Sequence, residues 1–431
     1  MEEAPVVVVG GGLSGLACAR ALRDAGRAVV VLEGGSSVGG RARSELRDGV
    51  AVDRGFQVMF RGYGRVSRLA ARAGIPRSDL RELFWGAEFR SGASIRTLGG
   101  VPPKRGGLSV GDAARLGRLL AEVAVGSPER HLAGQEEGVT TDAYLRSRGV
   151  SDRAVEEVLR PLFAGIFLDR DLAADAGYLR YLMAVMLRGP ALLPTDGLGQ
   201  ISQWLASALV RDGATIRLDA PMAGFEMSEE GGRVEGVRLE SGEVQRADGV
   251  VLAVSAEAAG RLLKPLDPAS ASRIPTESAS MVSLAYRLAR PLFDGRAVVL
   301  NSAPVAVDVH IDLMCQTSNI TRQGSSDVVL ATSITTGLSA RPDDAALGRA
   351  VGDLVGEWSP GFSWSRDAEL IEVVDHPHAQ YRVLPGVRRQ LPGPRTAIAN
   401  LLLAGDVTTH PSLEGAVASG QTAARILIGR G

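Results

Sequence analysis

Three glycines near the start of the chain have the spacing of a phosphate-binding turn. Gly10, Gly12 and Gly15 form a G-x-G-x-x-G pattern directly after the four valines of residues 6–9. In such a pattern the first glycine permits a tight turn, the second lets the backbone approach a pyrophosphate, and the third lets a helix pack closely on a strand. The spacing therefore indicates a site for a nucleotide with linked phosphates.

An acidic residue completes this pattern. A helix is expected over residues 13–25, and the backbone N–H groups at its start, on Leu13 and Ser14, would point at the phosphates. A second valine-rich strand ends at Glu33, whose carboxylate could accept hydrogen bonds from ribose hydroxyls and would repel the 2′-phosphate of NADP. Together these features predict a dinucleotide site, but they do not distinguish NAD from FAD.

Two short segments that follow narrow the choice. Residues 38–43 read V-G-G-R-A-R and residues 53–57 read D-R-G-F-Q. Both resemble segments of the flavin-containing amine oxidase superfamily, which includes phytoene desaturases, protoporphyrinogen oxidases and monoamine oxidases. The resemblance implies that FAD is the cofactor, that Arg41 meets its pyrophosphate, and that the backbone of residues 55–57 passes near the isoalloxazine ring. The family often has an arginine where Ser37 stands, so the contact of that arginine on the adenosine side is not expected here.

The end of the chain resembles the closing motif of the same family. Residues 401–404 are expected to form a strand, Gly405 lets the backbone pass close to the cofactor, and Asp406 could accept a hydrogen bond from a ribityl hydroxyl. A helix is expected from near Leu413. Its positive end would point at the N1/C2=O edge of the flavin, where negative charge develops on reduction. The two ends of the chain are thus expected to build one site.

The residues of the predicted FAD site are spread along the whole chain. Met222 is included because in relatives the residue at this position meets the adenine through its backbone, and Ala253 because residues 250–254 match the strand after which the chain returns to the flavin. The full set is Gly10, Gly12, Leu13, Ser14, Gly15, Glu33, Gly34, Gly40, Arg41, Gly55, Phe56, Gln57, Met222, Ala253, Gly405, Asp406, Glu414, Gly415 and Ala416.

The predicted fold class is α/β, with a Rossmann-type, GR2-like FAD-binding domain and an inserted mixed-sheet and helical substrate domain. The FAD-binding domain is expected to be discontinuous, consisting of residues 1–80, 191–270 and 385–431. Residues 81–190 and 271–384 are expected to form the substrate-binding domain with a helical cap. Hydrophobic periodicity predicts helices over residues 110–124, 140–148, 151–163 and 173–188.

Three residues near the expected flavin face are candidate catalytic groups. Residues 376–381 resemble the stretch that runs beside the flavin in the desaturase branch, so His378, Gln380 or Tyr381 could face the substrate, although structural hydrogen bonding on a loop is the favoured interpretation. His410 lies just before the final helix and could act as an acid or base near neutral pH. A capping or surface role for His410 fits equally well.

Two absences argue against an amine as the substrate. Amine oxidases of the family keep a lysine that holds a water at flavin N5, and the matching position here is Ser283. They also sandwich the amine between aromatic rings, one of which comes from the segment before the final helix, where this chain has Ser412. A cationic amine would lack the aromatic faces that attract it. The sequence is therefore closer to the desaturase and protoporphyrinogen oxidase branch, whose substrates are mostly apolar.

One alternation of acidic residues and histidine could indicate metal ligands or a relay. Asp308, His310 and Asp312 would share one face of a strand. A polar sheet face is the favoured interpretation, because no metal signature in the sequence is complete. No metal is therefore expected.

Three arginines follow the second flavin segment, at Arg54, Arg61 and Arg65. An arginine at the rim of an active site could bind a substrate carboxylate. In a chain this rich in arginine, ordinary structural positions are the favoured interpretation.

Composition indicates an ordinary globular protein. The chain has 431 residues and a net charge of −1, with 45% hydrophobic residues, which favours two domains and argues against nucleic acid as a partner. Its two cysteines have no paired spacing, which excludes a disulfide framework and fits a reducing compartment. No signal peptide and no apolar run of about 18 residues is present. A cytoplasmic location is expected, and peripheral membrane contact and a homodimer remain open.

The sequence thus predicts an FAD-dependent oxidoreductase that moves a hydride from its substrate to flavin N5. Desaturation of a hydrophobic or conjugated small molecule is the favoured reaction, with oxygen or a quinone as the electron acceptor. An amine or amino-acid oxidase, a redox-neutral flavin-dependent isomerase and a non-catalytic flavoprotein remain as alternatives.

Overall fold

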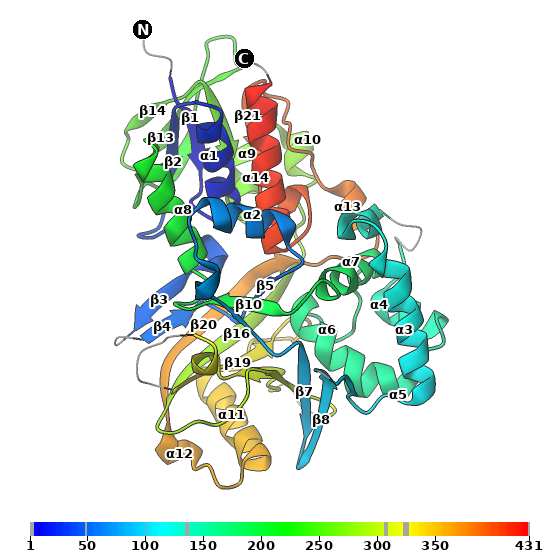
Figure 1. Cartoon of the computed structure of the whole chain (residues 1–431). Coiled ribbons are helices and arrows are strands. Elements are labelled where there is room, and N and C mark those ends of the chain that lie inside the picture. The colour runs from blue at the N-terminus through cyan, green and yellow to red at the C-terminus, as the bar shows by residue number, and fades with distance from the viewer. Residues whose placement is uncertain are drawn as a thin grey trace.

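A five-stranded parallel sheet forms the upper part of the molecule (Figure 1). The order of its strands is β11 (Thr215–Arg217), β2 (Val29–Leu32), β1 (Val6–Val9), β15 (Gly249–Leu252) and β21 (Leu401–Leu403). This is the strand order of a nucleotide-binding α/β sheet, and the predicted fold class is confirmed. The computed structural model describes residues 4–47, 50–100, 102–133, 138–305, 309–321 and 327–429.

Helices cover one face of the parallel sheet. They are α1 (Leu13–Asp24), α8 (Gln200–Arg211) and α14 (Leu413–Ile428), and α2 (Gly64–Arg72) lies across their lower ends in Figure 1. Strand side chains alternate between the two faces, and Val8 points into the core that these helices share. The first and last helices of the chain, α1 and α14, lie side by side.

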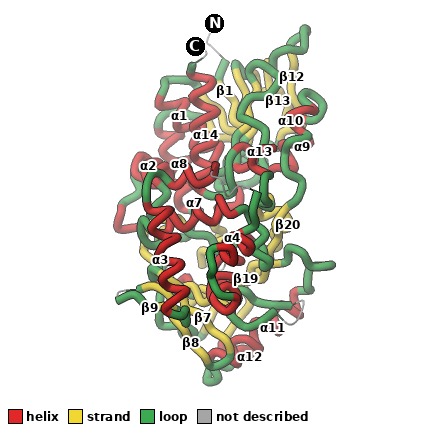
Figure 2. Tube along the Cα trace, turned by 90° about the vertical axis from the view of Figure 1, so that its right-hand side faces the viewer, coloured by secondary structure: helices red, strands yellow, loops and turns green. Residues whose placement is uncertain are grey.

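A small antiparallel sheet covers the opposite face. It consists of β12 (Met222–Met227), β13 (Val234–Leu239) and β14 (Val244–Arg246). Val7 and Val9 of β1 point into the core between the two sheets. Figure 2 shows β12 and β13 on the side of β1 that faces away from α1 and α14. Because both of its faces are covered, β1 can be valine throughout.

A mixed eight-stranded sheet forms the lower part of the molecule. α11 (Asp344–Trp358) packs against one of its faces, in a core that includes Val282 and Leu284. The opposite face looks toward the predicted flavin segment, because Ala285 shares a core with Val50 and Val52. In order, the strands are β20 (Ala368–Tyr381), β16 (Ser278–Leu288), β19 (Asp327–Ile334), β18 (Leu313–Cys315), β17 (Val298–Asn301), β7 (Gly86–Ser91), β8 (Ser94–Gly99) and β9 (Lys104–Arg105).

The predicted helical cap is present beside this sheet. α3 (Val110–Ala124) matches its expected range, and α4 (Thr141–Ser147) and α7 (Ala176–Met186) lie within theirs. The third predicted helix is present and continuous, and consists of α5 (Asp152–Ala154), a π-helical turn and α6 (Arg160–Phe167). α7 is buried on most of its sides, as an almost wholly apolar helix should be.

The remaining elements are short helices, turns and the strands of two small sheets, one of two strands and one of three. They are β3 (Ser44–Arg47), β4 (Val50–Asp53), β5 (Met59–Phe60), β6 (Leu80–Glu82), β10 (Ala191–Pro194), α9 (Ala256–Leu263), α10 (Pro268–Ala271), α12 (Trp364–Asp367), α13 (Val387–Gln390) and the short turns η1 (Gly40–Ala42), η2 (Arg77–Asp79), η3 (Pro128–Ala133), η4 (Val155–Leu159), η5 (Thr317–Asn319) and η6 (Asp406–Thr408).

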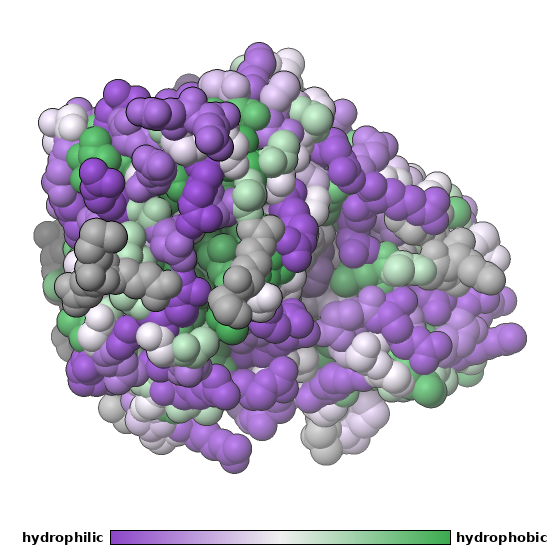
Figure 3. Space-filling view, turned by 90° about the horizontal axis from the view of Figure 1, so that it is seen from above, coloured by the Kyte–Doolittle hydropathy of each residue, from purple (hydrophilic) through white to green (hydrophobic). Residues whose placement is uncertain are grey.

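The strands of the parallel sheet come from the three stretches expected to form the FAD-binding domain, and those of the eight-stranded sheet come from the other two. The exact domain boundaries stay a prediction. Seen from above, the molecular surface is mainly hydrophilic, with small separate apolar areas (Figure 3). Among the helices described, none is both long and apolar enough to cross a membrane.

Candidate functional site

The predicted phosphate turn has the geometry that its glycines require. Gly10 adopts a left-handed φ of 106°, and a Cβ atom there would lie 2.4 Å from the carbonyl oxygen of Ala253. A Cβ atom on Gly15 would lie 2.0 Å from the carbonyl oxygen of Gly10, so α1 packs on β1 only with glycine at this position. A Cβ atom on Gly12 would meet nothing within 4 Å. The open side of the turn is therefore at the N-terminal end of α1, where backbone N–H groups attract phosphate.

Glu33 lies directly against this turn. Its Oε2 accepts a hydrogen bond of 2.6 Å from the N–H of Gly11, and its Oε1 accepts one of 2.8 Å from the N–H of Gly35. These bonds hold the carboxylate beside the place where a phosphate would lie. Its contact with ribose hydroxyls remains a prediction that this position allows.

Met222 lies at the start of β12, close to the same turn. A Cβ atom on Gly34 would be 3.5 Å from Cα of Pro221, the residue before Met222. The side chain of Met222 is buried between the parallel sheet and β13. A contact of Met222 with an adenine could therefore involve only its backbone, and it stays a prediction.

The two ends of the chain meet at an ion pair. Arg41 Nη2 lies 2.8 Å from Asp406 Oδ2, and Arg41 Nη1 donates a 2.8 Å hydrogen bond to the carbonyl of Ala379. A Cβ atom on Gly40 would be 3.5 Å from Cα of Gly12, so the turn that carries Arg41 lies against the phosphate turn. The Asp406 side chain is buried whereas that of Arg41 is 44% exposed. The guanidinium is thus accessible to a ligand.

Small residues allow α1 and α14 to pack closely. A Cβ atom on Gly420 would be 2.1 Å from the carbonyl oxygen of Ser14. The hydroxyls of Ser14 and Ser419 are 2.9 Å apart, and Ser419 Oγ accepts a 2.6 Å hydrogen bond from the N–H of Gly405. The helix of the first motif is thereby tied to the strand end of the closing motif.

Asp53 ties the second flavin segment to the turn before α8. Its carboxylate accepts hydrogen bonds from the N–H of Leu198, at 2.9 Å, and from the hydroxyl of Ser44. Burial raises the pKa of Asp53 to about 6. Gln57 Nε2 donates a 2.9 Å hydrogen bond to the carbonyl of Arg41. The segment is therefore held at Asp53 by the turn before α8 and at Gln57 by the turn that carries Arg41.

The backbone at Gly55 passes close to the eight-stranded sheet. A Cβ atom on Gly55 would be 2.9 Å from Cε of Met281, and Phe56 packs against the core that contains Ala285. Met281 and Ala285 lie on the face of β16 that also carries Ser283, since strand residues alternate. Ser283, the position of the amine-oxidase lysine, therefore faces the predicted flavin segment.

The Glu414 side chain caps a neighbouring helix. Its carboxylate accepts hydrogen bonds of 2.9 Å from the N–H of Arg65 and 3.0 Å from that of Val66, at the start of α2. Burial raises the pKa of Glu414, whereas the positive end of α2 favours the carboxylate. Glu414 thus has only its backbone left for the predicted cofactor contact.

His410 lies under the start of α14 and is uncharged. A Cβ atom on Gly415 would be 2.2 Å from the carbonyl oxygen of His410. Ser412 Oγ caps α14 by accepting a hydrogen bond from the N–H of Gly415, and it lies 3.0 Å from His410 Nδ1. The Ser412 carbonyl accepts a hydrogen bond from the N–H of Ala416. Burial, and then the charge of Arg388, lower the pKa of His410 to about 3. His410 is therefore neutral at pH 7 in this packing, and its role as an acid or base stays a prediction.

Acidification is expected to destabilise the fold through His410. The unfolded histidine titrates near pH 6.5 and the folded one near 3, so protons favour the unfolded chain and stability is lost as the pH falls. Between about pH 7.5 and about pH 5.5 the loss from this group is about 1.4 kcal/mol. Urea unfolding of the wild type and of His410→Asn at both pH values measures it, with the exposed His378→Asn as control. Equal pH dependence in all three proteins would contradict it.

The other two candidate catalytic residues have different surroundings. Tyr381 is buried, donates a 3.1 Å hydrogen bond to the carbonyl of Thr409, and has a pKa raised by burial. The side chain of His378 is 56% exposed and lies 3.1 Å from Ser278 Oγ and 3.7 Å from Glu257. Tyr381 therefore joins His410 at the loop before α14, and His378 does not.

A row of aromatic rings, whose arrangement only the structure shows, lies beside this loop. The ring centroids of Tyr181 and His410 are 4.6 Å apart, those of Tyr178 and Tyr181 are 5.9 Å apart, and those of Phe167 and Tyr178 are 5.8 Å apart. Tyr178 also donates a 2.6 Å hydrogen bond to a carbonyl of the loop. The available signal was the spacing of the two tyrosines, which places them on one helix face.

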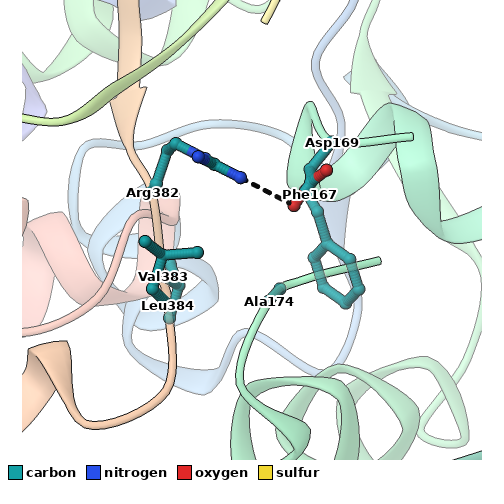
Figure 4. Close-up of a pocket in the computed structure, with 6 residues that line it drawn as sticks. All are labelled: Phe167, Asp169, Ala174, Arg382, Val383 and Leu384. Carbon is teal, nitrogen blue, oxygen red and sulfur yellow. Dashed lines mark hydrogen bonds and ion pairs between the residues drawn. The ribbon is translucent and has the colours of Figure 1, made fainter. Parts of the chain in front are cut away.

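A narrow cleft opens at Phe167, the outer end of this row. Figure 4 shows Arg382 reaching across the cleft toward Asp169, with 3.4 Å between Nη2 and Oδ2. Gln380, near the end of β20, donates a 2.8 Å hydrogen bond to the carbonyl of Phe167, so it caps α6. The cleft is lined by Phe167, Asp169, Ala174, Arg382, Val383 and Leu384.

The polar residues before β18 take part in structural contacts. Asp312 holds the guanidinium of Arg170 through two hydrogen bonds, of 2.9 Å from Nε and 2.8 Å from Nη2. Burial lowers the pKa of His310. Asp308 lies outside the described residues. His310 and Asp312 precede β18 and lie in no strand, so the predicted shared strand face is wrong for these two residues.

The three arginines after the second flavin segment have protein partners. Arg54 Nη1 lies 3.5 Å from a carboxylate oxygen of Glu45, and Arg61 forms an exposed ion pair with Glu82. Arg65 Nη1 donates a 3.1 Å hydrogen bond to the side-chain oxygen of Gln421. These contacts fit structural positions better than a rim that binds a substrate.

Known proteins resemble the whole chain. The model of the flavin-containing amine oxidoreductase family matches residues 13–428. The 15-cis-phytoene desaturase of Synechococcus elongatus is 22% identical over 460 residues, which cover 99% of this chain and 96% of that protein. An oxidoreductase of Methanosarcina mazei has a similar structure, with a TM-score of 0.75 at 16% identity over 98% of this chain and 100% of its own. So does cyclohexylamine oxidase of Brevibacterium oxydans, with a TM-score of 0.74 at 19% identity over 99% of each chain.

Proposed function

The chain belongs to the family of flavin-containing amine oxidoreductases, and from this premise we propose that it is an FAD-dependent enzyme that dehydrogenates an apolar or conjugated small molecule. The chemistry that FAD supplies when bound is acceptance of a hydride at N5, with oxygen or a quinone as the final electron acceptor. In this proposal Glu33 binds the ribose, Arg41 the pyrophosphate and Asp406 the ribityl chain.

The phosphate turn supports a dinucleotide as the cofactor. The space beside Gly12 is open, and α1 begins there without a side chain capping its first N–H groups. Arg41 is accessible above this turn, and Glu33 lies against it. Turn, cation and acid are the groups that the phosphates and ribose of FAD need.

The observation that carries the choice of substrate is that the hydroxyl of Ser412 is already used by contacts within the fold. Its hydroxyl caps α14 and contacts His410, at the position where amine oxidases place an aromatic ring. Ser283, in place of their lysine, is buried and uncharged. The tyrosine rings that lie nearby, those of Tyr178 and Tyr181, are buried and stacked on one another. They therefore offer apolar surroundings rather than the open ring faces that attract a cationic amine.

The residues of this region would bind and orient the substrate rather than exchange protons with it. Burial raises the pKa values of Tyr178 and Tyr181 well above their ordinary range, and lowers that of His410. At neutral pH none of the three side chains carries a charge. A closely packed, uncharged surface also excludes water from the reacting atoms.

Anaerobic mixing of the FAD-bound protein with candidate substrates tests this proposal. Conjugated apolar compounds are expected to bleach the visible absorbance of the flavin, and primary amines are not. Faster bleaching by amines would favour an amine oxidase, which the likeness to cyclohexylamine oxidase keeps as the second candidate. Turnover only after prior reduction, without net electron transfer, would instead identify an isomerase, and a flavin that no compound bleaches would identify a non-catalytic flavoprotein.

A further inference from the structure

Arg388, on α13, is a partly buried arginine whose charge has no carboxylate partner among the described residues. Its Nη1 donates a hydrogen bond to the carbonyl of Leu132, in η3. Its Nε is buried and, within the described part of the chain, has no hydrogen-bond partner. Arg382, earlier on the same stretch, lies within 3.4 Å of Asp169. Arg382 Nε is likewise buried without a partner within the described part of the chain. The two neighbouring arginines therefore differ in one respect, which is that Arg382 has a carboxylate beside it.

An arrangement of this kind is costly unless something else completes it. A buried N–H donor without an acceptor loses its hydration without replacement. A guanidinium carries five donors in a planar fork and cannot lose its charge. A ligand that brings an acidic group to Arg388 would satisfy both the buried Nε and the positive charge.

The guanidinium of Arg388 lies beside the predicted substrate region. Its positive charge adds to the lowering of the pKa of His410 and opposes the rise that burial causes in the pKa values of Tyr178 and Tyr381. Its hydrogen-bond partner Leu132 belongs to η3, which packs against α7, the helix of the aromatic row. Figures 1 and 2 both place α13 near α7 and the lower end of α14. Arg388 thus lies between η3 and the loop before α14.

We propose that Arg388 binds a carboxylate of the substrate, so that the substrate is an apolar molecule that carries an acidic group. The proposal rests on the proposed function, in which the aromatic row receives the apolar part. A single guanidinium matches the planar carboxylate in geometry and charge. A phosphate would call for several cations or a set of backbone N–H groups.

Binding of two matched probes to the FAD-bound protein tests the proposal. trans-Cinnamate and its uncharged amide, cinnamamide, share their shape and differ in the acidic group. The wild type is expected to bind cinnamate about ten-fold more tightly than cinnamamide, as a charge-assisted hydrogen bond allows. Arg388→Gln should abolish this preference and Arg388→Lys should retain part of it. The adjacent, exposed Arg389→Gln is the control and should keep the full preference.

Calorimetry reads these affinities without turnover, so the outcome is separate from that of the proposed function. No preference in the wild type, or an unchanged preference in Arg388→Gln, would overturn the carboxylate site and leave Arg388 as an anchor for η3. If Arg388→Gln does not fold, the test rests on Arg388→Lys, because a lysine keeps the charge but loses the planar fork. A preference for cinnamate as large in Arg388→Lys as in the wild type would then overturn the site. A protein without bound flavin would contradict the proposed function itself.

Discussion

Replacing Gly12 with valine is expected to abolish FAD binding without unfolding the chain. The φ and ψ of Gly12, −71° and 174°, are allowed for valine, and a Cβ atom meets nothing within 4 Å. The cost to folding should therefore be about 1 kcal/mol, from a poorer residue at the start of α1. The pyrophosphate must approach the backbone through the same open space, so the affinity for FAD should fall on the order of 100-fold or more.

Gly15→Ala provides the matched contrast. Its added Cβ atom would lie 2.0 Å from the carbonyl oxygen of Gly10, so the backbone of α1 or of the turn must move. The free energy of unfolding should fall by about 3 kcal/mol. Urea unfolding of the cofactor-free proteins and FAD titration of both variants make the comparison. FAD binding by Gly12→Val at wild-type strength, or unfolding of Gly12→Val as severe as that of Gly15→Ala, would contradict this account of the turn.

Loss of the Arg41 charge is expected to weaken FAD binding by about 10- to 100-fold, the range of a charge-assisted hydrogen bond. In Arg41→Gln the pyrophosphate loses its cation, and Asp406, whose side chain is only 7% exposed, loses its partner. The unpaired carboxylate would then repel the phosphates. Equilibrium titration of the cofactor-free protein with FAD measures the loss.

The double variant Arg41→Gln, Asp406→Asn should bind FAD better than the sum of the two single losses predicts. Removing the Asp406 charge relieves the repulsion that the first substitution creates, so the two effects are coupled. Arg72→Gln breaks an exposed ion pair with Asp24, 2.8 Å long, and should leave FAD affinity unchanged. Strict additivity of the two single losses, or equal losses in Arg41→Gln and Arg72→Gln, would show that the pair at Asp406 does not belong to the cofactor site.

Features that depend on short-range spacing could be predicted from the sequence. Gly10 and Gly15 have fixed places in a turn between a strand and a helix, and the structure shows the close contacts that exclude a side chain at both. The alternation of strand residues, and the apolar character of α7, follow from the same local rules. That the first and last strands of the chain share one sheet was implied instead by the resemblance of both chain ends to one family.

Features that depend on distant partners could not be predicted. Glu414 caps a helix that begins at Gly64, and no local pattern links the two. The pKa of His410 is lowered because Tyr181 and other residues bury its side chain. Burial by residues far away in the chain cannot be predicted from the spacing of residues in the sequence. The isolation of Arg388 is likewise visible only when the surrounding carboxylates have positions. The electrostatic surroundings of individual residues therefore became known only from the structure, whereas much of the fold could be predicted from the sequence.

The central claim is that the two ends of this chain together hold one FAD. The most direct test is to purify the full chain, saturate it with FAD, remove the free cofactor, and identify and quantify the flavin that denaturation releases. The account predicts FAD at one molecule per chain, with much less retained by Gly12→Val prepared in the same way. A colourless protein that takes up no FAD, or equal retention of FAD by both proteins, would contradict it.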